Sequence, residues 1–194
     1  MSNQLTTITD YFLELDALKT INRRTYINGG ERVENSAEHS WHLAMACWSL
    51  SKSLQLDLSE EKLLKLALVH DLGEIDAGDT FLYSSERNVA HTAERKCVKR
   101  LENHEGNAIS NLSELWEEQE TGNSIEAKLL KVVDRLLPFL HNISSSGKTW
   151  QELGIKKSQV VKAHEFIAND FPEIYSWMQD RLQEAVEEGW LDDS

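Results

Sequence analysis

The feature that most constrains this chain is a polar pair, His70 and Asp71, which ends the apolar run at residues 63–69. That run consists mostly of leucine and other apolar residues, so it predicts a segment packed in the core. A buried carboxylate is rare in proteins unless it pairs with another group or binds a cation. Any fold of this chain must therefore supply a partner for the pair.

Two further polar residues interrupt core-forming helical patterns in the same way: His39, within residues 37–41, and Asp134, within residues 131–137. The four residues together offer two imidazoles and two carboxylates. With water in the remaining positions, this donor set suits Mn, Fe, Co, Ni, Zn or Mg better than a metal that prefers thiolates. We predict one divalent metal ion held by His39, His70, Asp71 and Asp134.

The alternative for each residue is a structural one. His39 alone is more simply interpreted as a core histidine with satisfied hydrogen bonds, and Asp134 as one half of a salt bridge to Arg135. Neighbouring residues on a helix point in different directions, which argues against the salt bridge. The presence of all four residues in one chain favours the metal.

Helical periodicity dominates the chain, which contains only two prolines and few alternating β-type runs. We predict an all-α fold. Asn35 with Glu38 three residues later indicates a helix start, and Ser59 and Ser124 are expected to cap two more helices. On the helix after Ser59, His70 and Glu74 would share one face. The remaining helices are expected at about 5–20, 89–103, 112–120, 160–168 and 171–188.

The length of 194 residues fits a single domain, 1–194, and no repeat or linker divides it. Within it we expect a metal-site core at about 20–140 and a C-terminal helical hairpin at about 155–190.

The formal charge of −13 argues against a nucleic acid polymer or an anionic membrane as a partner, because both are bound through basic surface. No apolar stretch approaches the roughly 20 residues of a membrane span, and the N-terminus lacks the features of a signal peptide. Cys47 and Cys97 have no paired or metal-like spacing, so we expect reduced thiols and a cytoplasmic protein.

Three segments of the chain resemble one known family: residues 35–40, NSAEHS; residues 70–79, HDLGEIDAGD; and residues 125–136, IEAKLLKVVDRL. They are similar to the HD-domain metal-dependent phosphohydrolases, and among these to the small 5'-deoxynucleotidase-like members. The resemblance extends over about residues 20–140. It implies an HD-domain helical bundle, an enzyme that hydrolyses a phosphate ester, and a homodimer.

The resemblance also implies roles for individual residues. Glu74 matches the acid that orients and deprotonates the attacking water, and Arg23 matches an arginine that binds the phosphate. Asp79 matches an acid that contacts the sugar or the leaving oxygen. Arg24 stands where some relatives have tryptophan, so it adds a positive charge that favours a substrate with more phosphates.

The predicted activity is the removal of the 5'-phosphate from a 2'-deoxyribonucleoside monophosphate, a small nucleotide substrate. One alternative is a triphosphohydrolase that acts on deoxynucleoside triphosphates at the same metal site. Another is a non-catalytic nucleotide or metal sensor with the same fold. His91 and His104 are possible ligands of an additional metal, although a single ion is the preferred interpretation.

Overall fold

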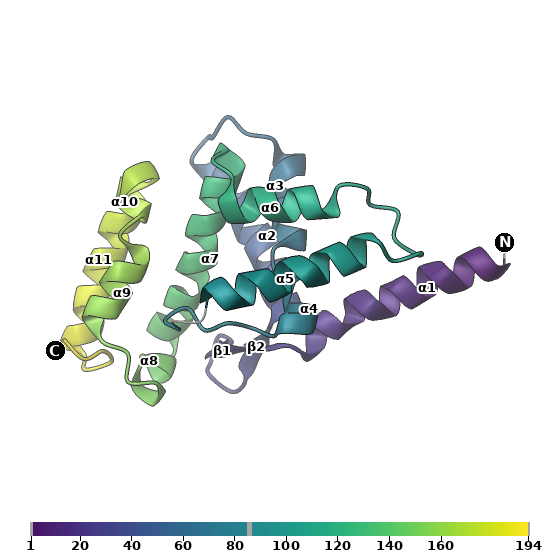
Figure 1. Cartoon of the computed structure of the whole chain (residues 1–194). Helices are drawn as coiled ribbons and strands as arrows, with labels where there is room; N and C mark the ends of the chain where they lie inside the picture. Colours follow the sequence, from purple (N-terminus) through teal and green to yellow (C-terminus); the bar gives the residue numbers. More distant parts are fainter. Residues whose placement is uncertain (1, 85–86, 194) are drawn as a thin grey trace. The chain divides into compact units, whose positions relative to one another are not determined.

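The computed structural model describes residues 2–84 and 87–193, and most of them are helical (Figure 1). The prediction of an all-α fold is confirmed. By their internal contacts the described residues form two compact units. Unit 1 comprises residues 2–22, 35–80, 84 and 87–133; unit 2 comprises residues 23–34, 81–83 and 134–193.

Unit 1 contains the helices of the N-terminal two thirds of the chain. In chain order they are α1 (Ser2–Asp16), the 3-10 helix η1 (Ala17–Thr20), α2 (Ser36–Ser53), α3 (Glu60–Val69), α4 (Glu74–Ala77), α5 (Arg87–Glu102) and α6 (Leu112–Thr121). The helix α7 (Ile125–Ser144) contributes its first nine residues to this unit.

The core of unit 1 lies where α3, α5 and α6 meet. Helix α2 packs against α3, and α5 and α6 run side by side (Figure 1). Both cysteines are free and buried, as expected for reduced thiols in the core. One cluster of buried side chains comprises Tyr11, Leu18, Val69, Leu72, Cys97, Val98, Leu101, Leu112 and Trp116.

The predicted helix starts are confirmed. Asn35 accepts a hydrogen bond from the backbone of Glu38, whose carboxylate in turn accepts one from the backbone of Asn35. The Ser59 side chain accepts from the backbone of Lys62, and the Ser124 side chain from that of Ala127. Such caps satisfy backbone donors that have no partner within the helix. The capping box places His39 in the first turn of α2.

One helix prediction is wrong. We expected His70 and Glu74 on a single continuous helix, but α3 ends at Val69 and α4 begins at Glu74. Between them, the backbone of Leu72 donates to Val69 and that of Glu74 to Asp71, three residues back instead of four. This tighter winding breaks the helical register. His70 and Asp71 therefore lie on a turn and not on a helix face.

Unit 2 begins with a hairpin that the periodicity did not predict. Strands β1 (Asn22–Tyr26) and β2 (Val33–Asn35) pair around a loop in which Gly29 and Gly30 have φ of 93° and 72°. These are values that glycine adopts without strain. Strands of five and three residues are too short for a clear alternating pattern, so periodicity does not reveal them.

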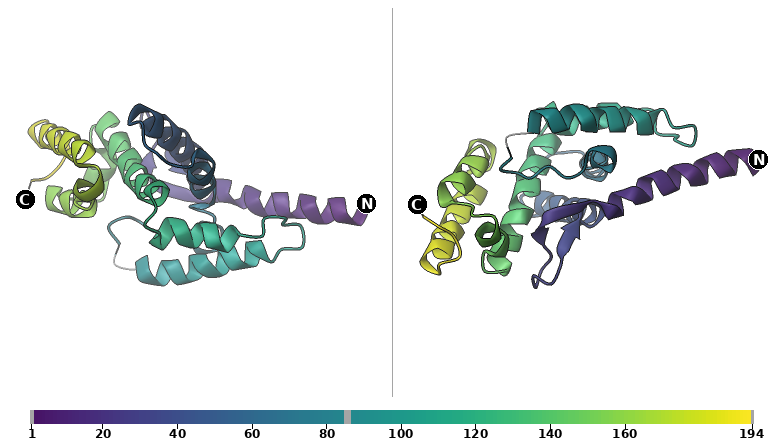
Figure 2. Two further views of the ribbon diagram at one scale, coloured as in Figure 1. Left: turned by 90° about the horizontal axis from the view of Figure 1, so that it is seen from above. Right: turned by 60° about the horizontal axis from the view of Figure 1, so that its bottom comes forward.

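The rest of unit 2 is helical: the second part of α7, α8 (Lys148–Glu152), α9 (Lys157–His164), α10 (Ile167–Asp170) and α11 (Pro172–Glu187). Helices α9 and α11 pack side by side (Figure 2). Helices α8 and α10 were not predicted. Phe139 on α7 contacts the rings of Trp150, His164 and Trp177, which joins these elements into one core.

Candidate metal centre

Three of the four predicted metal ligands converge in unit 1. His39 on α2 is fully buried, and His70 and Asp71 follow the end of α3, which packs against α2. One ligand atom from each residue lies within 4.8 Å of the others. The His39 and His70 rings have centroids 5.5 Å apart, and His70 Nδ1 lies 2.7 Å from Asp71 Oδ1. Residues 31 positions apart in sequence thus form one compact donor set.

The chemistry of this donor set fits a divalent cation. Two imidazoles and a carboxylate are ligands for borderline metals such as Zn, Mn, Fe, Co or Ni. Asp71 is 5% exposed, so a bound cation would offset the cost of removing its carboxylate from water.

Glu74 lies at the start of α4, one turn after Asp71, and is also buried. Its Oε2 accepts a hydrogen bond of 2.5 Å from Ser36 Oγ on α2. The backbone N–H of Glu74 donates to the carbonyl of Asp71 at 3.0 Å. These two contacts fix a carboxylate beside the donor set in unit 1 without requiring it to be a ligand.

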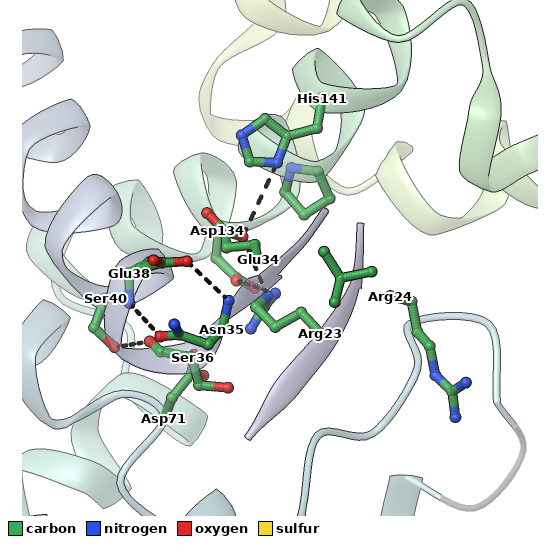
Figure 3. A network of polar contacts seen from close by, with 12 residues as sticks. Arg23, Arg24, Glu34, Asn35, Ser36, Glu38, Ser40, Asp71, Asp134 and His141 are labelled. Atoms are coloured by element: carbon green, nitrogen blue, oxygen red, sulfur yellow. Dashed lines mark hydrogen bonds and ion pairs between the residues drawn. The ribbon is translucent and has the colours of Figure 1, made fainter. Parts of the chain in front are cut away.

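A second polar network lies in unit 2, around Arg23 on β1 (Figure 3). Arg23 Nε lies 3.6 Å from Glu34 Oε2, and its Nη2 lies 3.9 Å from Asp134 Oδ1. His141 Nδ1 on α7 lies 4.0 Å from the same Glu34 oxygen. All four side chains are largely buried. The two carboxylates beside the guanidinium offset part of the cost of removing its charge from water.

Asp134 also contacts Arg135, contrary to our argument from helix geometry. Arg135 Nη1 donates to Asp134 Oδ2 at 2.8 Å. The Arg135 side chain is long enough to fold back along α7, so the divergence of adjacent positions does not keep the charged ends apart. Asp134 is the first residue of unit 2. Its role as the fourth ligand stays a prediction.

The two adjacent arginines of β1 have different environments. The Arg23 side chain is mostly buried, whereas Arg24 is exposed and points away from it (Figure 3). Successive side chains of a strand point to opposite faces, which explains the difference. Asp79, the third predicted substrate contact, follows Gly78 in unit 1 and is partly buried.

Contacts from α8 hold the hairpin that carries Arg23. Lys148 Nζ donates to the carbonyl of Gly30 at 2.8 Å and lies 3.7 Å from the centroid of the Tyr26 ring. Thr149 Oγ1 donates to the carbonyl of Arg24. Gly147, before α8, has φ of 74°, and a Cβ there would lie 2.2 Å from the carbonyl oxygen of Trp190. Glycine is therefore required where the chain before α8 passes close to the backbone of Trp190.

Sequence reasoning missed three residues of these networks: Ser36, Glu34 and His141. Ser36 immediately follows a predicted cap, and a serine there is usually interpreted as part of the capping sequence. Glu34 gave no signal because it lies on an unpredicted strand. His141 lies seven residues after Asp134 on α7, two helical turns further along the same face. That spacing is the signal that could have identified it.

The two histidines considered as extra ligands differ. The His104 ring packs on Tyr11 with centroids 5.3 Å apart, and its Nδ1 accepts a hydrogen bond from the backbone of Gly106. His104 is therefore part of a structural contact between α1 and the turn after α5. His91 lies instead among carboxylates on α5 and α6.

Residues 15–175, which make up more than four fifths of the chain, match the model of the HD domain family. The chain belongs to the HD-domain family. The prediction of an enzyme of the HD-domain phosphohydrolase type is thereby confirmed at the level of the family.

Relatives of known name are similar over part of their length. The 5'-deoxynucleotidase HDDC2 of Dictyostelium discoideum is 29% identical over 143 residues, which cover 70% of this chain and 73% of the relative. HDDC2 of Danio rerio is 31% identical over 55% of this chain and 52% of its own length. Human HDDC2 is 29% identical over 54% of this chain and 51% of its own length. The chain thus spans about half the length of its vertebrate relatives.

Solved structures of this fold include a predicted metal-dependent phosphohydrolase from Magnetospirillum magnetotacticum. It is 31% identical, with a TM-score of 0.85 over 97% of this chain and 96% of that one. A protein from Pyrococcus horikoshii is 25% identical, with a TM-score of 0.60 over 93% of this chain and 99% of that one. These likenesses extend over both units, so the HD-domain fold accounts for nearly the whole chain and implies a divalent metal.

Proposed function

We propose that the protein removes the 5'-phosphate from 2'-deoxyribonucleoside monophosphates in a metal-dependent reaction. The observation that carries the proposal is the convergence of His39, His70 and Asp71 beside the buried carboxylate of Glu74. The names of the HDDC2 relatives support the substrate class, since they are 5'-deoxynucleotidases.

One metal ion would be held by His39, His70, Asp71 and, as the fourth ligand, Asp134. A bound divalent cation supplies Lewis acidity, which acidifies a water molecule and polarises a phosphate oxygen. Co, Mn, Mg, Zn, Ni and Fe are all compatible with imidazole and carboxylate ligands.

Glu74 is the proposed general base. In the reaction a water oxygen forms a bond to phosphorus and the bond from phosphorus to the 5' oxygen breaks. Glu74 accepts a proton of the water, and the departing 5' oxygen takes up a proton from solvent, which releases the nucleoside and inorganic phosphate. The hydrogen bond from Ser36 Oγ to Glu74 Oε2 orients the carboxylate for this task. A sensor without catalysis would have no need for such a base, which argues against that alternative.

Arg23 is proposed to bind the phosphate and Asp79 the sugar. A guanidinium offers two parallel N–H donors to phosphate oxygens, and Arg23 carries its charge into a largely buried network. Arg24 points away from Arg23, so the two do not form one extended phosphate contact. This arrangement favours a monophosphate over a triphosphate.

A panel of deoxynucleoside monophosphates, diphosphates and triphosphates, together with the ribonucleoside monophosphates, assayed with each divalent metal, tests the proposal. Phosphorus NMR identifies the product. We expect inorganic phosphate from 2'-deoxyribonucleoside monophosphates and little from the ribonucleotides. Faster release of inorganic triphosphate from a deoxynucleoside triphosphate would establish the triphosphohydrolase instead. Binding without any turnover would establish the sensor.

We further propose a homodimer. On α2, Trp41, Met45 and Trp48 are 67%, 45% and 41% exposed and follow one another at helical spacing. Contiguous exposed apolar side chains of this size are typical of protein interfaces. Light scattering of the wild type and of Trp41→Glu tests this: a dimer that becomes a monomer supports it, and a wild-type monomer contradicts it.

A cytoplasmic location is proposed from the cysteines. Cys47 and Cys97 are both buried and free, as is usual in a reducing compartment. Among the helices of the described residues, none combines the length and the apolar character that crossing a membrane requires.

A further inference from the structure

A second group of metal-ligand side chains lies between α5 and α6, and none of its members belongs to the proposed catalytic centre. His91 and Glu94 are three residues apart on α5 and so share a face of that helix. Glu120 lies at the C-terminal end of α6, which packs against α5. One ligand atom from each of the three residues lies within 4.8 Å of the others.

Polar contacts hold two members of the group in place. His91 Nδ1 lies 2.9 Å from Glu120 Oε2, and Gln119 Nε2, from a buried side chain, donates to Glu120 Oε1 at 2.9 Å. A carboxylate held by a second hydrogen bond needs little rearrangement to bind a metal. The His91 and Glu120 side chains are 35% and 19% exposed, so an ion from solution can reach them.

The electrostatics of the group favour a cation. Glu94 and Glu120 bring two carboxylates within 4.8 Å of each other in a partly screened position, where like charges repel. The neighbouring Arg95 pairs with Glu117 and stacks on Trp116. The formal charge of −13 for the whole chain adds to the attraction of a positive ion.

We propose that His91, Glu94 and Glu120 form a second binding site for a divalent transition metal, of the Zn²⁺ or Co²⁺ type. One imidazole with two carboxylates is a donor set that these ions accept, with water completing the coordination. The three ligand atoms lie close enough together for one ion to bind all of them. The metal engages all three residues and joins α5 to α6.

The position of Glu94 indicates what the ion does. A Cβ on Gly73 would lie 2.5 Å from Glu94 Cβ and 2.8 Å from its Cα, so α5 touches the backbone just before Glu74. A metal bound by residues of both α5 and α6 would stabilise the packing of α5 against the start of α4. The ion is structural, and its loss lowers stability more than it lowers the rate of the chemical step.

Titration of metal-free protein with Co²⁺, followed by calorimetry and visible absorption, tests the site. The wild type is expected to bind two equivalents. The double variant His91→Gln with Glu120→Gln is expected to bind one, because loss of ligands weakens affinity by at least about 10-fold. Glu114→Gln, an exposed acid on the same α6, is the matched control and should retain both equivalents.

Thermal unfolding with and without added Co²⁺ gives a readout independent of catalysis. Added Co²⁺ should raise the midpoint temperature of unfolding of the wild type more than that of the double variant. The reason is that a ligand that binds only the folded state stabilises it. The single variant Glu120→Gln serves if the double variant does not fold by circular dichroism. Two equivalents with unchanged affinity in the variants, or one equivalent in the wild type that His39→Ala removes, would overturn the proposal.

Discussion

The two compact units contribute different kinds of groups to the proposed chemistry. In unit 1 the groups are the imidazoles and carboxylates of His39, His70, Asp71 and Glu74, held by adjoining ends of α2, α3 and α4. In unit 2 they are Arg23 and Asp134, which belong to a network of alternating charges on a hairpin and α7.

This difference separates two functions. The donors of unit 1 converge within that unit alone, so most of the affinity for the metal should reside there. Unit 2 offers a cationic group, which suits recognition of the phosphate. Variants of His39, His70, Asp71 and Glu74 should therefore affect metal binding and the rate constant, and variants of Arg23 chiefly the affinity for substrate.

The largest effect is expected at Glu74. Glu74→Gln should retain metal and fold but lose about 10²- to 10⁴-fold in kcat, the usual contribution of a general base. Ser36→Ala, which removes only the hydrogen bond that orients Glu74, should lose less. Steady-state kinetics with metal analysis checks both. Near-normal turnover of a metal-replete Glu74→Gln would rule out its role as the base.

Arg23 should produce the next largest effect, and mainly in KM. Arg23→Ala removes a charged hydrogen bond to phosphate worth about 1.5 to 3 kcal/mol, or roughly 10- to 150-fold. Arg24→Ala should change little with a monophosphate, since that side chain points away. The ratio of the two KM values is the measurement. An equal effect of both substitutions would contradict the separation of their roles.

Glu34 should act through Arg23 and so have a smaller effect. Glu34→Gln keeps the size of the side chain but removes a buried countercharge 3.6 Å from the guanidinium. We expect KM to rise by about 2- to 10-fold with kcat retained, as for one moderate polar interaction. Glu31→Gln, an exposed acid in the same hairpin, is the control. A fall in kcat with constant KM would exclude this positioning role.

The sequence anticipated unit 1 better than unit 2, for a physical reason. His39, His70 and Asp71 interrupt strongly apolar helical patterns, and Asn35 and Ser59 mark helix starts by local hydrogen bonds. Such features can be predicted from the sequence because they depend on residues that are near one another in the chain. The break between α3 and α4 was missed because it depends on the approach of α5 to Gly73, a contact between distant segments.

In unit 2, most of what matters comes from distant contacts. The hairpin of Arg23 is stabilised by Lys148 and Thr149, more than a hundred residues away. Glu34 and His141 meet only in the folded chain. Periodicity carries no information about such pairs, so the substrate contacts had to come from the family resemblance alone.

The smallest predicted effect is the change of folding stability with pH. Groups in the two units should lower the stability in different pH ranges. Burial lowers the pKa of His164 in unit 2, although the carbonyls of Val160 and Arg135 favour its charged form. The unfolded chain then binds more protons below about pH 6.5, so stability falls as pH drops through that range, by at most about 1.4 kcal/mol per pH unit. In unit 1, hydrogen bonds from Lys99 and Ser113 hold the pKa of Glu102 at about 2. The stabilisation that the Glu102 carboxylate provides is lost only when the pH falls below 4.5, the usual pKa of a glutamate.

Urea unfolding of the wild type and His164→Gln at pH 7.5 and 5.5 checks this prediction. The wild type should lose more stability between these values than the variant does. His104→Gln in unit 1 serves as the control. Identical pH dependence in all three proteins would show that His164 is not responsible.

The central claim, that His39, His70 and Asp71 hold the metal, is tested most directly by metal stoichiometry. The measurement is made in the His91→Gln with Glu120→Gln background, so that the second proposed site does not contribute. We expect one bound equivalent of Mn²⁺ or Co²⁺ in this background, none after His39→Ala, weaker binding after Asp134→Ala, and full binding after His104→Ala. A full equivalent bound with unchanged affinity after His39→Ala would contradict the account.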